Sequence, residues 1–170
     1  MNLEYSVYTS KQLGPIYVVS DGEAIVRIEL FEEDWQQLCQ KQPMMKSDSP
    51  LLHSAVKQLD EYFAGKRKTF DLPLKWKGTA FQEKVWKALC EIPYGETVSY
   101  ADIAEKIGHP KAVRAIGQAN RANNLAIIVP CHRVIGKNKK LVGYAGNRID
   151  VKEKLLELEK ENRKSCLIRV

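Results

Sequence analysis

The chain has 170 residues, of which 44% are hydrophobic and 28% are charged, a balance that is ordinary for one or two small folded domains. This composition excludes wholesale disorder. The mean hydropathy is -0.37, and the longest apolar runs, such as residues 125–129, are too short to cross a bilayer. Because the N-terminus lacks the basic and apolar regions of a secretory signal, we expect a cytoplasmic protein without a membrane partner.

The cysteines of the chain are scattered and form no C-x-x-C pair; they are Cys39, Cys90, Cys131 and Cys166. A reducing compartment keeps such thiols free. A tetrahedral zinc site needs four ligands, but Cys39 and His53 are the only Cys and His among residues 1–80. We therefore expect neither disulfides nor a metal ion.

Positive charge is concentrated in the second half of the chain. The total is 27 basic against 21 acidic residues, a net charge of +6. Residues 1–80 carry 10 basic and 11 acidic side chains, whereas residues 81–170 carry 17 and 10. Between Lys106 and Arg148 there are nine Lys or Arg and no Asp or Glu. Charge of one sign over this length predicts a polyanionic partner, although a basic surface without a partner stays an alternative.

Residues 1–76 are predicted to form a small N-terminal α/β domain. Strand-forming residues fill 4–9, 16–20 and 23–30, and the Asp21-Gly22 pair between the last two runs predicts a hairpin. Ser49-Pro50 opens a helix with an apolar stripe that ends at Gly65. We expect one more strand at 69–72, followed by a linker at 75–78.

Residues 79–165 are predicted to form a mainly helical domain. The capping-box patterns Thr79-x-x-Gln82 and Ser99-x-x-Asp102 each predict the start of a helix. Asp150-x-x-Glu153 predicts the start of the last helix by the same criterion. The whole chain is therefore assigned to the α+β class.

Another helix is predicted to run from Lys111 to about Arg121. A Gly-containing break at 108–110 separates it from the helix before, which is typical of a helix-turn-helix. Small or apolar residues occupy one face, and a basic and polar stripe without acidic residues occupies the other. The stripe consists of Lys111, Arg114, Gln118 and Arg121. This pattern is typical of a DNA recognition helix.

Cys131 follows Pro130 at the end of the apolar run 125–129 and precedes His132. An isolated Cys-His pair is weak evidence for chemistry, because a free cysteine is often a buried hydrophobic residue. Basic neighbours favour the thiolate, which is the nucleophilic form. From the residues alone, a reactive Cys131 and an inert buried one both stay open.

The segment Pro130-Cys131-His132-Arg133-Val134 resembles the active-site signature of the O6-alkylguanine-DNA alkyltransferases, also called methylated-DNA–protein-cysteine methyltransferases. The resemblance covers the whole second domain in the right order. It includes Phe81-Gln82, residues 95–100 and 110–117, Asn123, residues 143–146 and Glu159. The first domain resembles the family's N-terminal ribonuclease-H-like unit in its order of strands and helix.

This resemblance implies a suicide reaction of DNA repair that needs no cofactor. Cys131 would attack the alkyl carbon on O6 of guanine, and on O4 of methylated thymine, to form a permanent thioether. His132 would deprotonate the thiol through a water, since neighbours in an extended segment point to opposite faces and a direct bond is not expected. Glu159 would orient the imidazole, and Tyr100 would donate a hydrogen bond to ring N3 of the leaving guanine.

The resemblance also implies that a monomer binds double-stranded DNA through the minor groove. The alkylated nucleotide would be rotated out of the duplex, and Arg114 would fill the vacancy. Asn123 would tie the recognition helix to the Cys131 loop. Many family members have serine where this chain has Ala145, so that a backbone contact survives there but a hydroxyl contact does not. Further contacts with DNA or the base are implied for Gln82, Ala101, His109, Val134, Lys137, Tyr144 and Ala145.

Three rival interpretations each explain part of the sequence. A non-catalytic alkyltransferase-like protein would grip lesions and recruit other factors, but such proteins lack the nucleophile that Cys131 supplies. A helix-turn-helix regulator with an incidental cysteine explains the basic helix, but not Tyr100, Asn123 and Glu159 together. A cysteine hydrolase leaves the net charge of +6 without a role.

Overall fold

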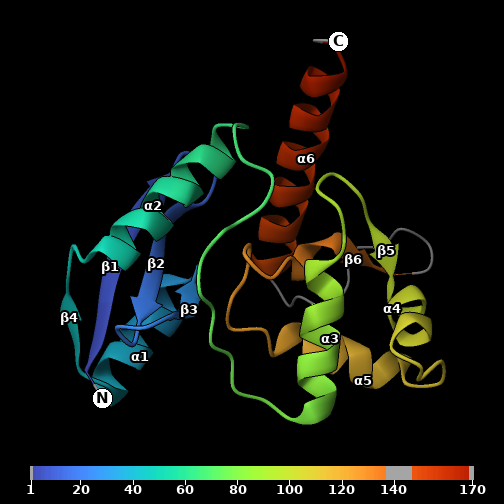
Figure 1. The fold of residues 1–170 in the computed structure, drawn as a ribbon, viewed down its shortest axis with the longest axis horizontal. Helices are drawn as coiled ribbons and strands as arrows, with labels where there is room; N and C mark the ends of the chain where they lie inside the picture. The colour runs from blue at the N-terminus through green and yellow to red at the C-terminus, as the bar shows by residue number, and fades with distance from the viewer. Residues whose placement is uncertain (1, 137–146, 169–170) are drawn as a thin grey trace. The chain divides into compact units, whose positions relative to one another are not determined.

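The computed structural model describes the backbone of residues 2–136 and 147–168, and the side chains of 2–136 and 150–163. The described chain divides into two compact units (Figure 1). The first holds the residues up to Trp76 together with Asn124–Ala126, and the second holds the others. The boundary predicted between 76 and 79 did not anticipate the return of Asn124–Ala126 to the first unit. Among the described residues, no helix is both long and apolar enough to span a membrane.

The first unit is built on a four-stranded sheet with the order β3-β2-β1-β4. Its strands are β1 (Leu3–Ser10), β2 (Gly14–Ser20), β3 (Ile25–Glu29) and β4 (Met44–Lys46). Strand β2 is antiparallel to both β1 and β3, and β4 is parallel to β1. The first three strands confirm the prediction. The predicted turn is also confirmed, since Asp21 Oδ1 accepts from the backbone N–H groups of Glu23 and Ala24, both at 2.9 Å.

Two helices, α1 (Glu32–Lys41) and α2 (Pro50–Phe63), complete this unit. Tyr17 of β2 stacks on Trp35 of α1 at 4.2 Å, whereas Tyr8 of β1 stacks on Phe63 of α2 at 5.8 Å. Tyr17 pairs with Val7, the neighbour of Tyr8, in the sheet register. Because successive residues of a strand point to opposite faces, the two helices cover opposite faces of the sheet (Figure 1).

Two features of this unit differ from the prediction. Helix α1 was not predicted, because Trp35 is its only buried side chain and no apolar stripe marks it in the sequence. The strand predicted at 69–72 is wrong, since that segment is not extended along a partner. Leu74 instead makes an isolated bridge with Ile25.

The second unit contains a helix-turn-helix and a two-stranded sheet. Its elements are α3 (Ala80–Cys90), β5 (Val98–Ser99), α4 (Tyr100–Lys106), α5 (Val113–Arg121), the 3-10 helix η1 (Cys131–Arg133), β6 (Val134–Ile135) and α6 (Asn147–Ile168). Both predicted capping boxes are confirmed, at Thr79 with Gln82 and at Ser99 with Asp102. Helix α6 begins at Asn147, before the predicted Asp150.

Helix α5 has the two faces that its sequence predicts. Ile116, Ala119 and Asn120 are buried, and the stripe of Lys111, Arg114, Gln118 and Arg121 is exposed. The helix begins two residues later than predicted, because Ala112 N–H donates to His109 O in the preceding turn. The turn and α5 therefore present basic side chains on one surface.

Candidate active site

The segment that carries Cys131 is a tight turn that directly precedes a strand. Val98 and Ser99 of β5 pair in parallel with Val134 and Ile135 of β6, directly after η1. Within the turn, Cys131 N–H donates to Val129 O at 2.8 Å. The expectation of an extended Cys131–His132 segment is therefore wrong, since these residues form a turn of 3-10 helix. Cys131 itself is buried.

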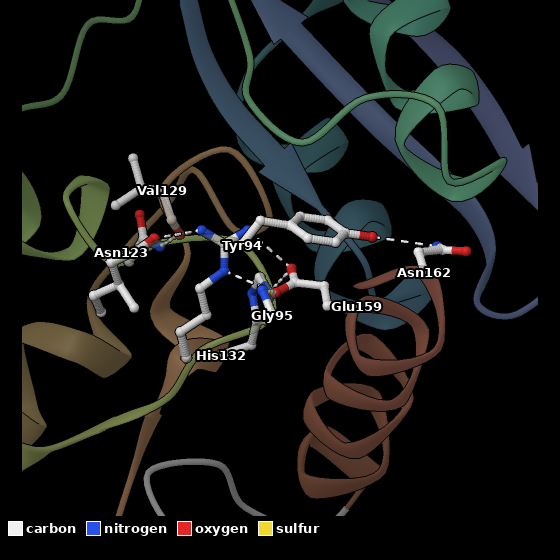
Figure 2. Close-up of polar contacts among 9 residues, drawn as sticks. Tyr94, Gly95, Asn123, Val129, His132, Glu159 and Asn162 are labelled. Carbon is white, nitrogen blue, oxygen red and sulfur yellow. Dashed lines mark hydrogen bonds and ion pairs between the residues drawn. The ribbon is translucent and has the colours of Figure 1, made fainter. Parts of the chain in front are cut away.

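The carboxylate of Glu159 hydrogen-bonds several polar groups that are close to Cys131 in the fold. Its Oε2 lies 2.6 Å from His132 Nε2, and both side chains are fully buried (Figure 2). Arg133 donates from Nε to Oε1 at 2.8 Å and from a terminal nitrogen to Oε2 at 3.0 Å. Gly95 N–H also donates to Oε1, and the other terminal nitrogen of Arg133 donates to Ile92 O. Glu159 is thus held by groups from two segments, one at Gly95 and the other at His132 and Arg133.

The protonation of this cluster follows from its contacts. Burial raises the pKa of Glu159, but the hydrogen bonds and charges of His132 and Arg133 outweigh burial and hold that pKa well below its usual range. Burial lowers the pKa of His132, against the effect of Glu159, so the imidazole is neutral at pH 7. A carboxylate only accepts, so the ring proton belongs on Nε2 and Nδ1 is left as an acceptor. No described residue hydrogen-bonds Nδ1.

Tyr100 begins α4 and lies against the same turn. Its side chain is buried, and burial followed by the charge of Cys131 raises the pKa of its phenol, whereas Asn120 and Arg121 lower it. The hydroxyl therefore keeps its proton at neutral pH. Tyr100 and Cys131 therefore lie close enough to interact electrostatically.

Two asparagines connect the recognition helix to this turn. Asn123 donates from Nδ2 to Val129 O at 2.9 Å (Figure 2). Asn120 donates from Nδ2 to Cys131 O at 3.3 Å. The first contact is the kind of tie expected of Asn123, and the second was not anticipated from the sequence.

Lys152 of α6 is a further site residue that sequence reasoning missed. Its side chain is fully buried, and Nζ lies 5.8 Å from the centroid of the Tyr100 ring. Burial lowers its pKa to about 8, against the charge of Cys131. The sequence did contain a signal for Lys152, because Lys152, Leu155 and Glu159 recur at helical spacing and so share one face of α6. All three side chains are buried in the structure. Arg133 was also missed as a functional residue, although it stands inside the signature.

The residues expected to contact DNA lie on several elements. Arg114 on α5 and His109 in the preceding turn are exposed, and Ala101 on α4 is half-buried. Gln82 caps α3 with its side chain, which accepts from Thr79 N–H at 3.0 Å. Val134 is buried in β6. The predictions for Lys137, Tyr144 and Ala145 lie outside the described residues.

Comparison with known proteins agrees in both units. Residues 3–76 match the ribonuclease-like domain of 6-O-methylguanine DNA methyltransferase, and residues 80–161 match its DNA binding domain. The constitutive methylated-DNA–protein-cysteine methyltransferase of Bacillus subtilis is 51% identical over 159 residues, which are 93% of this chain and 96% of that protein. A protein of the same name from Mycobacterium tuberculosis is 47% identical over 148 residues, 87% of each chain.

Solved structures agree with the sequence matches. A crystal structure of Mycobacterium tuberculosis O6-methylguanine methyltransferase has a TM-score of 0.82 and 43% identity, over 94% of each chain. A structure of OGT from that organism in complex with DNA has a TM-score of 0.81 and 42% identity, over 95% of this chain and 94% of the other. The predicted α+β fold with a ribonuclease-like first domain is confirmed. From both domains together, the chain belongs to the 6-O-methylguanine DNA methyltransferase family.

Proposed function

We propose that this protein repairs DNA directly, by transferring the alkyl group of O6-alkylguanine to Cys131 in a single turnover. The observation that carries the proposal is a buried thiol that is followed in the same turn by a buried His132, whose Nδ1 has no hydrogen-bond partner among the described residues. Relatives named methylated-DNA–protein-cysteine methyltransferase at 51% and 47% identity support the reaction class. The DNA complex of a similar protein supports DNA as the partner.

In the proposed step, a water joins the thiol of Cys131 to Nδ1 of His132 and carries the proton between them. The thiolate attacks the alkyl carbon in line with the bond to O6, so that the S–C bond forms as the C–O6 bond breaks. The electron pair of the broken bond stays on guanine, which then takes up a proton. Glu159, held by Arg133, keeps the ring proton of His132 on Nε2 and so keeps Nδ1 basic.

Two side chains would stabilise the negative charges of this step, one on the sulfur and one on the leaving base. The protonated amine of Lys152 lies near Cys131 and would attract the negative charge of the attacking sulfur. The hydroxyl of Tyr100 donates to ring N3 of guanine, where negative charge develops as the base leaves. Neither role requires a metal or another cofactor. A thiolate is a poor leaving group from an alkyl carbon, so the resulting thioether would be permanent and each molecule would act once.

DNA binding would use the exposed basic stripe of α5. An alkylated O6 inside a duplex is out of reach of a buried thiol, so the nucleotide must be rotated out of the stack. Arg114 is exposed at the beginning of α5 and would enter the minor groove to occupy the vacancy. Val134 and Ala145 would hold the base through backbone groups, with Tyr144 forming part of the pocket wall. Gln82, Ala101, His109 and Lys137 would make further contacts with the DNA.

The remaining parts of the proposal follow from the same chemistry. O4-methylthymine offers a similar alkyl carbon on an exocyclic oxygen and would be a second substrate. All the groups invoked come from one chain, so the protein would act as a monomer. Since the substrate is chromosomal DNA and the thiol must stay reduced, the protein would work in the cytoplasm.

Mass spectrometry of the intact protein after incubation with an O6-methylguanine duplex tests the proposal. We expect a stoichiometric gain of one CH2, located on the peptide that contains Cys131. Cys131→Ala should bind the duplex without gaining mass, whereas Cys39→Ala, at an exposed cysteine, should react like the unchanged protein. Lesion binding without any gain of mass would favour the non-catalytic lesion-binding interpretation instead.

A further inference from the structure

Residues 92–96 contain a tight turn whose backbone contacts the buried cluster around Glu159. Glu96 N–H donates to Pro93 O at 3.1 Å, and the φ angle of Gly95 is 80°. A hydrogen bond between the first and fourth residues, with a positive φ at the third, is typical of a type II turn. In a type I turn the third residue has a negative φ, and the peptide that precedes it is turned over. The positive φ of Gly95 therefore decides to which side of the turn its N–H points.

The backbone of this segment binds both members of the buried ion pair. Gly95 N–H donates to Glu159 Oε1 at 3.1 Å (Figure 2). Ile92 O accepts from a terminal nitrogen of Arg133 at 2.7 Å. An N–H group thus meets the anion and a carbonyl group meets the cation. The fork of Arg133 fixes the carboxylate relative to the guanidinium, whereas the backbone of residues 92–95 fixes both of them relative to the fold.

Helix α6, which carries Glu159, also holds this turn. Asn162 donates from Nδ2 to the hydroxyl of Tyr94 at 3.2 Å (Figure 2). Arg163 donates from a terminal nitrogen to Gly95 O at 3.1 Å. Asn162 and Arg163 follow Glu159 by three and four positions, so all three lie on one face of the helix. The same helix face therefore supplies the carboxylate and fastens the residue whose N–H donates to it.

A side chain does not fit at Gly95. A Cβ atom there would lie 2.8 Å from Cδ of Arg163 and 3.3 Å from its Cβ. A positive φ is also costly for any residue that has a Cβ. Gly14 has a similar φ of 78°, but a Cβ added to it would meet nothing within 4 Å. Gly95 thus combines a left-handed conformation with a close approach, whereas Gly14 has only the conformation.

We propose that the turn in residues 92–96 is a positioning element, in which Gly95 N–H, fastened by Arg163, orients the Glu159 carboxylate toward His132. This inference rests on the proposed function. In that orientation the carboxylate accepts from Nε2 of His132 and keeps the ring proton there. Without it the proton is free to move to Nδ1, which then no longer accepts the proton of the thiol. Gly95 and Arg163 act through Glu159, so they are positioning residues.

The first test measures the tautomer of His132 without substrate, from the NMR chemical shifts of its ring nitrogens at neutral pH. The single-turnover rate with O6-benzylguanine is measured in parallel. Gly95→Ala should mix the Nδ1–H tautomer into the Nε2–H form of the unchanged protein and slow transfer about tenfold. Gly14→Ala is the matched control, because it places the same side chain at a similar φ. It should keep both the tautomer and the rate.

The second test removes the fastening bond while Gly95 stays in place. Arg163→Met should change the tautomer and the rate in the same direction as Gly95→Ala, by a smaller factor. Arg163→Lys, whose amine can still donate to Gly95 O, should restore both. Lys160→Met, at an exposed position of α6, controls for the loss of one positive charge and should change neither.

An unchanged tautomer in Gly95→Ala would overturn the positioning role, even where transfer is slower, since the turn would then serve stability alone. Equal changes in Arg163→Met and Arg163→Lys would overturn the role of the bond to Gly95 O. Should Gly95→Ala fail to fold, the two Arg163 variants decide. Absence of transfer by the unchanged protein would defeat the proposed function itself, and it is distinguishable because the tautomer is measured without substrate.

Discussion

His132 Nε2 and Glu159 Oε2 lie 2.6 Å apart, and neither side chain is exposed to solvent. A buried carboxylate is stable only when it is paired and hydrogen-bonded, and the bidentate contact from Arg133 meets that need. The guanidinium stays charged, so Glu159 stays anionic whether or not His132 carries a second proton. The pair therefore fixes the imidazole tautomer, and Glu159 itself neither takes up nor releases a proton.

Glu159→Gln should slow alkyl transfer by about 100-fold or more, because an amide in this position can donate to Nε2 and move the ring proton to Nδ1. The single-turnover rate with O6-benzylguanine measures the effect. Glu157→Gln, at an exposed position on the same helix, is the control and should keep the rate. Equal rates for Glu159→Gln and the control would contradict the role of the carboxylate.

Arg133→Met should destabilise the fold by about 3–5 kcal/mol, since it leaves the Glu159 carboxylate buried with one partner fewer. Arg133 lowers the pKa of His132, so its loss should raise that pKa and move the acid limb of the pH–rate profile to higher pH. Urea unfolding and single-turnover rates between pH 5 and 8 measure the two effects. An unshifted acid limb would show that Arg133 serves stability alone.

Stability should fall on acidification from about pH 6.5, the ordinary pKa of histidine. Folding lowers the pKa of His132, so below that pH the unfolded chain binds a proton that the folded chain does not. The depressed pKa of Glu159 adds stability that is present above the ordinary carboxyl range and is lost as pH falls further. Thermal unfolding at several pH values measures both. His132→Gln should reduce the dependence of the melting temperature on pH between pH 5 and 6.5. An unchanged pH dependence in this variant would contradict this account.

Lys152→Met should slow transfer about tenfold at pH 7, because the thiolate of Cys131 loses a nearby positive charge. The pKa of Lys152 is lowered to about 8, so its charge is present below that pH and is lost above it. The rate ratio between unchanged protein and variant should therefore shrink from pH 7 to pH 9. Lys154→Met, at an exposed residue of α6, should change the rate at neither pH. A constant ratio for Lys152→Met would exclude a charge effect.

Arg114→Ala should impair repair of an O6-methylguanine duplex by 100-fold or more, and reaction with free O6-benzylguanine by less than about threefold. The free base needs no rotation out of a duplex, so a residue that fills the vacancy is dispensable for it. Gln118→Ala, on the same exposed stripe, is the matched control. Equal losses on both substrates would argue against an intercalating role for Arg114.

Local signals in the sequence were enough for much of the second unit. The capping boxes at Thr79 and Ser99 use side chains within three residues of the bonds they form, so the pattern itself specifies the contact. The exposed stripe of α5 follows from helical periodicity alone. The roles of Cys131 and Glu159 came from resemblance to a family, and their chemistry stays a proposal.

Helix α1 and the segment 69–72 show where local signals end. Helix α1 is held by the stacking of Trp35 on Tyr17, a contact between separate elements that the periodicity of the helix does not reveal. Residues 69–72 contain strand-forming side chains, but a strand also needs a partner, and the sheet supplies none there.

The amino-acid sequence by itself determined the family, the nucleophile candidate, the helix-turn-helix and the concentration of positive charge in the second half of the chain. Only the tertiary structure decided that Arg133, Lys152 and Asn120 are buried beside Cys131. Charged and amide side chains are exposed in most proteins, so the sequence favours the wrong environment for all three. Their burial depends on packing among η1, α5 and α6, and the contact between Arg133 and Glu159 joins residues 26 positions apart. Local sequence patterns do not specify contacts between residues so far apart in the sequence, because such contacts form only when the chain folds.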